Sequence, residues 1–380
     1  MTAWTEPSPF VYDGPVPPDQ MIGRHHEAVT LRQWSTAGRF VALTAPRRYG
    51  KTSLINRVAR DAELHDRTAV VVADLYDVAS MADLVIRLER AWAEHTPSRL
   101  RDAVGRALAG AEVGLSLAGT GFTVALAERP DTDPLPALHT LLDLPNRLRD
   151  QREYDRVLVV LDEFQSLSRV PGAEALLRSY AQHQRRCASY LFAGSEPGML
   201  AAAFGDSSRP LYGQAETFRL GRLPADELTE AIAAGFERTE RHTGDVLPDL
   251  VGASEGHPQR AMLLAHLLWS RVPHGQVASP SAWAETLAVA LRRVDGEARA
   301  LLTGLSPGQR KTLRAVAEYG SPLNARALRT LALPKTSARQ SADQLVAEGV
   351  LERDEHGRWH VVDPLLGRWI KSELPTRSTL

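Results

Sequence analysis

The feature that most constrains this chain is a polar turn between an apolar stretch and a helical stretch, RFVALTAPRRYGKTSLINRVAR at residues 39–60. The apolar stretch predicts a buried strand, and the apolar residues at helical spacing after the turn predict a helix. Residues 45–52 read APRRYGKT and match the phosphate-binding spacing G-x-x-x-x-G-K-[ST], with Ala45 in place of the first glycine. A chance Gly-Lys-Thr turn is the alternative, and the flanking strand and helix argue against it.

The residue types of this turn suit a phosphate group. Gly50 lets the loop wrap closely, so that backbone N–H groups and the N-terminus of the following helix point at phosphate oxygens. Lys51 is expected to pair with the β- and γ-phosphates and Thr52 to ligate Mg²⁺, while Ala45 needs only a conformation that alanine can adopt. The predicted nucleotide contacts of the loop are Pro46, Arg47, Arg48, Tyr49, Gly50, Lys51, Thr52 and Ser53.

A second nucleotide motif follows about 110 residues later in the sequence. RVLVVLDEF at residues 156–164 is the most apolar strand candidate and ends in Asp162 and Glu163. Asp162 is expected to hold Mg²⁺ through its water shell, and Glu163 to polarise the attacking water. An Asp-Glu pair is often only the solvated end of a strand, but the position of this pair after the first motif favours a functional role. The adjacent glutamate favours hydrolysis over binding alone.

Strand and helix candidates alternate through the first 200 residues. Further strands are predicted at 68–76 and 188–195, and helices at 21–37, 81–95, 136–151 and 172–184. This alternation predicts an α/β fold with a mostly parallel sheet covered on both faces. Residues 103–130 alternate weakly about a Gly-Thr-Gly turn, which favours a hairpin over a helix. After Pro224 the candidates are helical, so a helical subdomain is predicted.

Composition excludes several classes of protein. The 45 Lys and Arg against 46 Asp and Glu argue against a uniformly basic nucleic-acid coat and against an acidic tail. One cysteine, Cys187, excludes an internal disulfide framework and a Cys-clustered metal site, and it fits a reducing compartment. No apolar run reaches the roughly 20 residues of a membrane helix, and residues 1–20 lack a signal-peptide pattern. We therefore predict a cytoplasmic protein with no membrane partner.

With both motifs identified, the chain resembles the AAA+ ATPases, and within them the archaeal-type ATPase group that borders the STAND signalling ATPases. Five segments carry the resemblance: MIGRHHE (21–27), APRRYGKTSL (45–54), VVLDEFQSL (159–167), YLFAGSEPGM (190–199) and EGHPQRAMLL (255–264). The resemblance implies a P-loop AAA+ core, ATP or ADP as ligand, Mg²⁺ as cofactor, and hydrolysis of ATP to ADP and phosphate.

The resemblance also implies roles outside the two motifs. Ile22, Gly23 and Arg24 match the box beside the adenine in relatives, with an ordinary helix N-terminus as the alternative. Ser195 matches a sensor residue near the γ-phosphate, with a helix cap as the alternative. Arg260 matches the sensor-2 arginine that reaches the nucleotide from the lid, with a surface arginine as the alternative. The predicted catalytic residues are Glu163, Lys51, Ser195 and Arg260.

No arginine finger stands out in the sequence. Arg185, Arg186 and Arg209 flank the sensor strand where a finger could lie, and each is equally compatible with a solvated charge. Whether the neighbouring subunit of a homo-oligomer completes the site therefore stays open.

Residues 305–375 predict a winged helix. The first helix has Ser306 and Pro307 at its start and Gly320 at its end. Two further helices, NARALRTLAL and KTSARQSADQLVAEGVL, and two short strands, LERDE and RWHVVD, follow. In DNA-binding relatives the third helix enters the major groove. The exposed candidates are Lys335, Ser337, Arg339 and Gln340, with Arg358 on the wing.

Double-stranded DNA and a protein partner both stay open as targets of this tail. Residues 301–380 carry 12 Lys and Arg against 8 Asp and Glu, whereas the first 300 residues carry 33 against 38. The excess is modest for a duplex binder, and LERDEHG places three acids at the wing. If the tail docks a protein instead, Trp359 and Trp369 are the first residues to test.

Four parts are predicted: an extended lead-in over 1–20, a nucleotide-binding core over 21–222, a helical lid over 223–300 and a winged-helix domain over 301–380. The main hypothesis is an ATPase that couples its nucleotide state to the winged helix. One alternative is a STAND-like switch that holds nucleotide tightly and turns over rarely. Another is a DNA-binding regulator with ATP as ligand.

Overall fold

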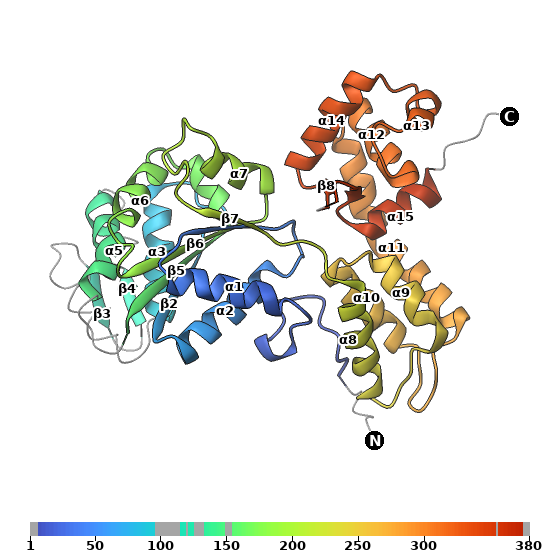
Figure 1. Ribbon diagram of the computed structural model, residues 1–380, viewed down its shortest axis with the longest axis horizontal. Helices are drawn as coiled ribbons and strands as arrows, with labels where there is room; N and C mark the ends of the chain where they lie inside the picture. The colour runs from blue at the N-terminus through green and yellow to red at the C-terminus, as the bar shows by residue number, and fades with distance from the viewer. Residues whose placement is uncertain are drawn as a thin grey trace. The chain divides into compact units, whose positions relative to one another are not determined.

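The computed structural model describes residues 7–95, 115–118, 121–124, 133–148, 154–354 and 356–374. The chain divides into two compact units (Figure 1). We call residues 25–45 and 51–220 the core unit, and residues 1–24, 46–50 and 221–380 the C-terminal unit. Most of the phosphate loop, residues 46–50, thus groups with the C-terminal unit, although the chain on both sides of it belongs to the core unit.

The core unit is built on a five-stranded parallel sheet with the order β2-β5-β6-β1-β7. The strands are β1 (Val41–Thr44), β2 (Thr68–Asp74), β5 (Arg156–Asp162), β6 (Ala188–Gly194) and β7 (Glu216–Arg219). β1 and β6 are buried along their whole length, as their largely apolar sequences predict. The predicted parallel sheet is confirmed. β7, with the sequence ETFR and mostly exposed side chains, has no apolar run to predict it.

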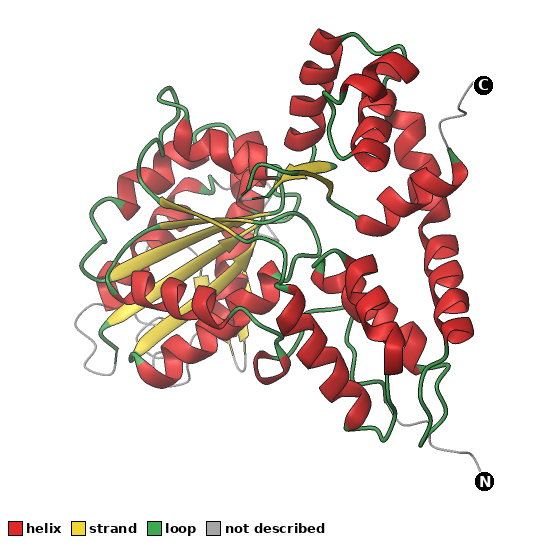
Figure 2. Cartoon of the chain, turned by 45° about the vertical axis from the view of Figure 1, so that its right-hand side comes forward, coloured by secondary structure: helices red, strands yellow, loops and turns green. Residues whose placement is uncertain are grey.

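Helices cover both faces of this sheet (Figures 1 and 2). α1 (His25–Thr36) and α2 (Lys51–His65) pack together on one face. The other face carries α3 (Met81–His95), α5 (Leu135–Leu148), α6 (Ala173–Ala181), α7 (Pro197–Gly205) and the 3-10 helix η3 (Phe164–Arg169). The predictions for α3, α5 and α6 are confirmed, whereas the helix predicted from residue 21 begins only at His25 and α7 is not predicted.

β3 (Leu115–Ala118) and β4 (Gly121–Val124) form a separate antiparallel pair, with Leu115 opposite Val124. This pairing confirms the hairpin predicted about the Gly-Thr-Gly turn. The other residues of the 103–130 prediction lie outside the described residues.

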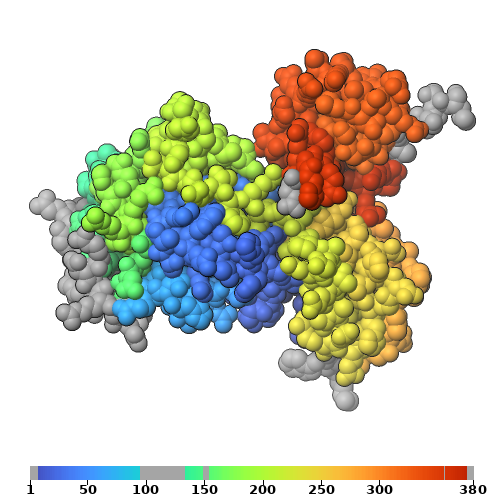
Figure 3. All heavy atoms as spheres, viewed as in Figure 1, coloured from blue at the N-terminus to red at the C-terminus, as the bar shows by residue number. Residues whose placement is uncertain are grey.

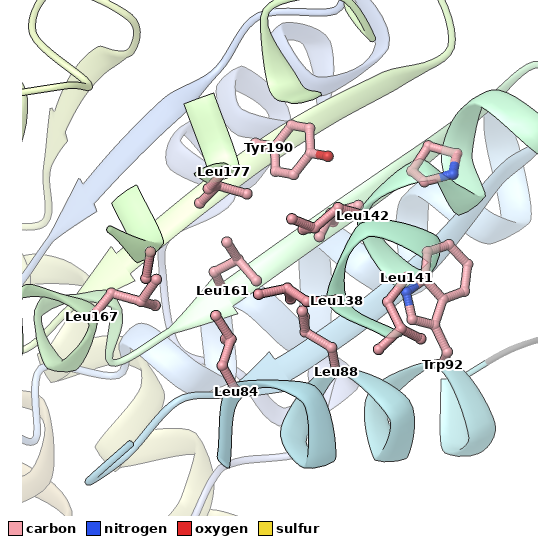
Figure 4. Close-up of a pocket in the computed structure, with 13 residues that line it drawn as sticks. Leu84, Leu88, Trp92, Leu138, Leu141, Leu142, Leu161, Leu167, Leu177 and Tyr190 are labelled. Carbon is pink, nitrogen blue, oxygen red and sulfur yellow. The ribbon is translucent and has the colours of Figure 1, made fainter. Parts of the chain in front are cut away.

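The apolar core between the sheet and α3, α5 and α6 holds a cavity of about 20 Å³, room for one water at most (Figure 4). Most of its lining residues are leucines, such as Leu84 of α3 and Leu138 of α5, with Trp92 and Tyr190 beside them. The Tyr190 hydroxyl donates to Gln184 Oε1 over 2.5 Å, and burial raises the pKa of Tyr190. The cavity is therefore a packing gap in the core, too small for a ligand.

The C-terminal unit is mostly helical. It contains α8 (Ala225–Glu237), η4 (Gly244–Val246), α9 (Leu247–Ser254), α10 (Pro258–Trp269), α11 (Pro280–Gly304), α12 (Pro307–Tyr319), α13 (Ala325–Thr330), α14 (Lys335–Ala347), β8 (Leu351–Arg353), β9 (Trp359–Val361) and α15 (Pro364–Glu373). One hydrophobic core joins α8–α11 to α12, α15 and the β8–β9 hairpin. α11 runs without a break across the predicted boundary between residues 300 and 301. None of the described helices is long and apolar enough to cross a membrane.

The elements after Leu305 have the predicted winged-helix arrangement, three helices followed by an antiparallel pair of strands. Ser306 caps α12 in a capping box with Gln309, and Gly320 ends this helix with φ at 70°. α15 is not predicted, and it packs against α11 and α12.

Part of the predicted lead-in over residues 1–20 belongs to the C-terminal core. Phe10 is buried and packs on Phe236 of α8, with 5.4 Å between the ring centroids. A Cβ at Gly235 would lie 2.6 Å from the Phe10 ring, so glycine leaves the space that this ring fills. Pro18–Gln20 form the short 3-10 helix η1.

Candidate functional site

The phosphate loop connects β1 to α2. Arg48 and Gly50 adopt positive φ, at 68° and 83°, and glycine does so without strain. Ala45 has a negative φ, and its N–H donates to Gly194 O over 3.3 Å. Alanine is therefore compatible with the entry of the loop, as expected.

Lys51, the first residue of α2, contacts both predicted acidic residues of the second motif. Its ammonium binds Asp162 Oδ1 and donates to Glu163 Oε1 over 3.0 Å. The Thr52 hydroxyl lies 3.4 Å from Asp162 Oδ2. Lys51 is only 7% exposed, so water screens this cluster of one cation and two carboxylates weakly. The structure thus joins the two motifs within the core unit.

Glu163 lies at the turn from β5 into η3, with a left-handed backbone at φ 52°. Its Oε2 accepts hydrogen bonds from Ser195 Oγ over 2.7 Å and from Gln165 Nε2 over 2.5 Å. Burial raises the pKa of Glu163, but the Lys51 charge and the hydrogen bonds from Ser195, Lys51 and Gln165 outweigh burial and hold the pKa below its ordinary value. Glu163 is therefore an ionised carboxylate near neutral pH.

Sequence reasoning identified Ser195 and missed Gln165. Ser195 directly follows β6, and its hydroxyl bonds Glu163 and not the start of α7, where Glu196 is the N-terminal cap residue. Gln165 lies in η3, two residues after Glu163 and inside the segment VVLDEFQSL, but no role was predicted for it.

Tyr49 is the loop residue most deeply enclosed in the C-terminal unit. Its side chain is fully buried, and its ring packs edge-on against His257 with 4.9 Å between the centroids. The Tyr49 hydroxyl donates to the carboxylate of Glu352 on β8 and lies 3.5 Å from Val362 O. A phosphate-loop side chain is thus bonded to the wing of the winged helix.

Arg222, absent from the sequence interpretation, extends this network. Its Nε donates to Glu352 Oε1 over 2.7 Å, its Nη1 to Glu255 O over 2.8 Å and its Nη2 to Val361 O over 2.9 Å. One guanidinium therefore bonds the end of α9 and both strands of the wing.

Arg260, the predicted sensor-2 arginine, is buried in the C-terminal unit. Its Nε donates to Asp363 Oδ1 over 3.0 Å and its Nη2 to Asp363 Oδ2 over 2.5 Å, a bidentate pair. Asp363 also caps α15 by accepting from Leu365 N over 3.0 Å. His257 caps α10, and burial lowers the pKa of its imidazole to about 3.

Arg260 also lines a cavity of about 330 Å³ in the C-terminal unit, together with the loop residues Arg47 and Arg48. Arg48 contacts Glu297 over 3.7 Å, and Asp363 neutralises Arg260. The cavity therefore has only a small excess of positive charge.

Of the other predicted loop residues, Pro46 and Ser53 are buried and Thr52 is exposed. The predicted adenine box directly precedes α1, so an ordinary helix N-terminus stays the alternative for these residues. Gly23 and Arg24 have positive φ, at 61° and 63°, and Ile22 packs against the C-terminal core. The buried Arg24 guanidinium donates to Gly221 O over 2.5 Å. Contact with adenine stays a prediction.

The three candidate finger arginines differ. Arg209 pairs with Glu174, and Arg185 lies 4.2 Å from the centroid of the Phe40 ring. Arg186 is exposed and makes no ion pair in the part of the chain that the structure describes.

α14 exposes most of the residues predicted to face DNA. Lys335, Arg339 and Gln340 are exposed, and Ser337 is half-buried. Arg358 on the wing is exposed, but its guanidinium pairs with Asp354 over 2.7 Å. Figure 3 shows the winged-helix residues in orange to red, forming a continuous surface in that view.

The structure describes two of the three acids that the sequence places at the wing, and both are bound by neighbouring side chains. Glu352 points inward and is buried against Tyr49 and Arg222. Asp354 binds Arg358 and lies 3.2 Å from His360 Nε2. The wing therefore presents less negative charge than its sequence suggests.

The interpretation of Trp369 as a residue that docks a protein partner is wrong. It is 4% exposed in the C-terminal core, and its indole N–H donates to Asp295 Oδ1 over 3.0 Å. Trp359 is half-buried, with the Arg353 guanidinium 4.0 Å from its ring centroid.

Thr52 and Asp162 fit a magnesium site that depends on a nucleotide. Among the described residues, no group of three or more His, Cys, Asp or Glu side chains is arranged to hold a metal ion. Mg²⁺ in phosphate sites usually takes one or two protein ligands and completes its shell with water and phosphate oxygens. A hydroxyl and a carboxylate 3.4 Å apart supply such a partial set.

Comparisons with solved structures identify the fold of this chain. No protein-family model and no curated protein match the sequence. Among solved structures, a Walker-type ATPase of Pyrococcus abyssi matches with a TM-score of 0.67 and 18% identity, over 96% of this chain and 99% of that one. The ORC2 protein of Aeropyrum pernix, in its ADPNP–ADP complexes, matches with a TM-score of 0.56 and 16% identity, over 95% of each chain.

These matches extend over nearly the whole chain. The chain therefore has the P-loop AAA+ fold, with a parallel-sheet core followed by a helical region and a winged helix, as the sequence resemblance predicts.

Proposed function

We propose that this chain binds Mg²⁺-ATP at the phosphate loop, hydrolyses it, and transmits its nucleotide state to the winged helix. The contact of Lys51 with Asp162 and Glu163 carries this proposal. The ammonium that would bind phosphate lies beside the carboxylates that would hold Mg²⁺ and activate water.

Charge supports the binding of ATP together with a cation. One ammonium and two carboxylates leave this cluster net negative, which repels a polyphosphate. Mg²⁺ supplies charge neutralisation and polarises the phosphate when bound. Lys51 then turns from the carboxylates to the phosphates, and residues 46–53 supply the remaining loop contacts.

Glu163 is the proposed general base. It accepts a proton from the attacking water, whose oxygen bonds the γ-phosphorus as the bond to ADP breaks. Ser195 orients Glu163. Arg260 stabilises phosphate charge once its guanidinium leaves Asp363. Ile22, Gly23 and Arg24 remain the proposed adenine contacts.

The bond between Tyr49 and Glu352 supports transmission to the winged helix. A nucleotide that reshapes the loop must move or release Tyr49, and Glu352 lies on a strand of the wing. Double-stranded DNA and a protein are both proposed targets of that module, and a homo-oligomer in the cytoplasm is the proposed setting.

Glu163→Gln tests the hydrolysis. The amide keeps the shape of the side chain and loses the base, so steady-state turnover should fall by ~10²-fold or more while ATP still binds. Turnover and calorimetric ATP binding are measured on the same preparation. Equal turnover in variant and wild type would refute Glu163 as the base.

A switch that holds nucleotide tightly is the second candidate function. Three donors already occupy the Glu163 carboxylate, which would slow proton transfer. Tight ATP binding with turnover near zero in the wild type would support the switch over the ATPase.

A further inference from the structure

Gln165 lies closer to the carboxylate of the proposed base than Ser195 or Lys51 does. Its Nε2 donates to Glu163 Oε2 over 2.5 Å and lies 3.4 Å from Ser195 Oγ. A carboxylate can only accept, so the end of Gln165 that contacts Glu163 must be the NH₂ group. Gln165 and Ser195 therefore both donate to Oε2, while Lys51 binds Oε1.

The oxygen end of the Gln165 amide, Oε1, is buried and has no hydrogen-bond partner among the described residues, and a buried polar atom left unpaired destabilises the fold. Its position requires a glycine opposite, because a Cβ at Gly194 would lie 2.5 Å from Oε1. A turn residue that only filled space would not need an amide here, since leucine has a similar volume and no polar atom to leave unpaired.

We propose that Gln165 is a positioning residue for Glu163. Its amide fixes Oε2, so that Oε1 is the oxygen left to accept the proton of the attacking water once Lys51 turns to the phosphates. Without this bond the carboxylate rotates about its last torsion angle, and the base is oriented in only a fraction of the complexes. This inference rests on the proposed hydrolysis.

Gln165→Leu is the first test, with ATP and Mg²⁺ as the probe. Because Gln165 touches Glu163 and Ser195 but none of the predicted contacts in the phosphate loop or the adenine box, kcat should fall about tenfold or more with KM changed less than about twofold. Loss of a donor that lowers the Glu163 pKa should also move the acid limb of the kcat–pH profile to higher pH. A residue that only shapes the turn would leave that limb in place.

Gly194→Ala is the second test and leaves Gln165 itself intact. The added methyl group would displace the amide from the opposite side, so the same loss of kcat and the same pH shift are expected. Gln182→Leu, an exposed glutamine at the end of α6, is the matched control and should behave as wild type.

The outcomes separate this inference from the proposed function. If Glu163→Gln abolishes turnover while Gln165→Leu and Gly194→Ala keep the wild-type kcat and acid limb, only the role of Gln165 is refuted. Wild-type protein without turnover would overturn both. If Gln165→Leu fails to fold by circular dichroism, Gly194→Ala alone decides.

Discussion

At the scale of single residues, Lys51 is the side chain on which the nucleotide site depends. It is the cation between Asp162 and Glu163, and the strand–loop–helix geometry places it at the start of α2. In the absence of nucleotide it offsets carboxylate repulsion, and with nucleotide it would offset phosphate charge.

Lys51→Ala should therefore lower ATP affinity by at least tenfold, about 1.4 kcal/mol, because a phosphate-facing charge is lost from a shielded site. Isothermal calorimetry on the folded variant checks this. Lys371→Ala, which removes an exposed lysine on α15, is the control and should bind as wild type. Unchanged affinity in Lys51→Ala would end the assignment of the phosphate loop.

Motif spacing predicted that Lys51, Asp162 and Glu163 belong to one nucleotide site, and the structure brings the three side chains together. It could not predict Gln165, whose role depends on the left-handed turn at Glu163. Nor could it predict Asp363, because a partner 103 residues from Arg260 is set by tertiary packing alone.

At the scale of elements, the prediction succeeded where apolar runs or caps mark the chain, as in β5 and α12. It failed for β7, which has four residues and mostly exposed side chains, because pairing with β1 decides that strand and is not written in local sequence. It also missed α15, although Asp363 and Pro364 mark its start with the same cap-and-proline pattern that predicted α12.

The N-terminal cap of α10 makes stability depend on pH. Burial lowers the pKa of His257 to about 3, whereas an unfolded histidine titrates near about 6.5. Between these values the unfolded chain binds a proton that the folded chain does not, so stability falls as pH decreases, by up to about 1.4 kcal/mol per pH unit. His257→Asn keeps a capping acceptor and should show a shallower loss between pH 6.5 and pH 4 in urea unfolding. Identical slopes would contradict this assignment.

The prediction that the chain binds duplex DNA concerns α14. Lys335 and Arg339 are four residues apart on the exposed helix, close enough to contact neighbouring phosphates. Changing both to alanine should weaken duplex binding and reduce the slope of its salt dependence by about two units, with ATP turnover unaffected. Arg238→Ala, an exposed site outside the winged helix, serves as control. Wild-type protein that binds no duplex would favour a protein partner, with Trp359 as the first residue to change.

At the scale of the whole molecule, most of the phosphate loop groups with the C-terminal unit, whereas the strand and the helix that it connects belong to the core unit. Residues 46–50 group with the winged-helix unit, and Tyr49 provides the bond to Glu352. One hydrogen bond therefore joins the phosphate loop to the wing within that unit.

Tyr49→Phe tests the coupling, because it keeps the ring against His257 and removes the hydroxyl that binds Glu352. In wild type, ATP should change hydrogen exchange of the amides of β8 and β9, and in the variant this change should shrink or vanish. Tyr212→Phe, at an exposed tyrosine, should respond as wild type. An undiminished response in Tyr49→Phe would mean that another contact carries the signal.

The length of α11 determines how far one end of this helix moves when the other end rotates. Its 25 residues form one unbroken rod of about 37 Å, which packs against α10 and also against α15 of the winged helix. A rod of that length converts a rotation of about 10° at one end into a displacement of roughly 6 Å at the other. Such a displacement approaches the width of a DNA minor groove, roughly 6 Å. Because one hydrophobic core joins α8–α11 to α12, α15 and the wing, any rotation of α10 would carry the winged helix with it as a single body.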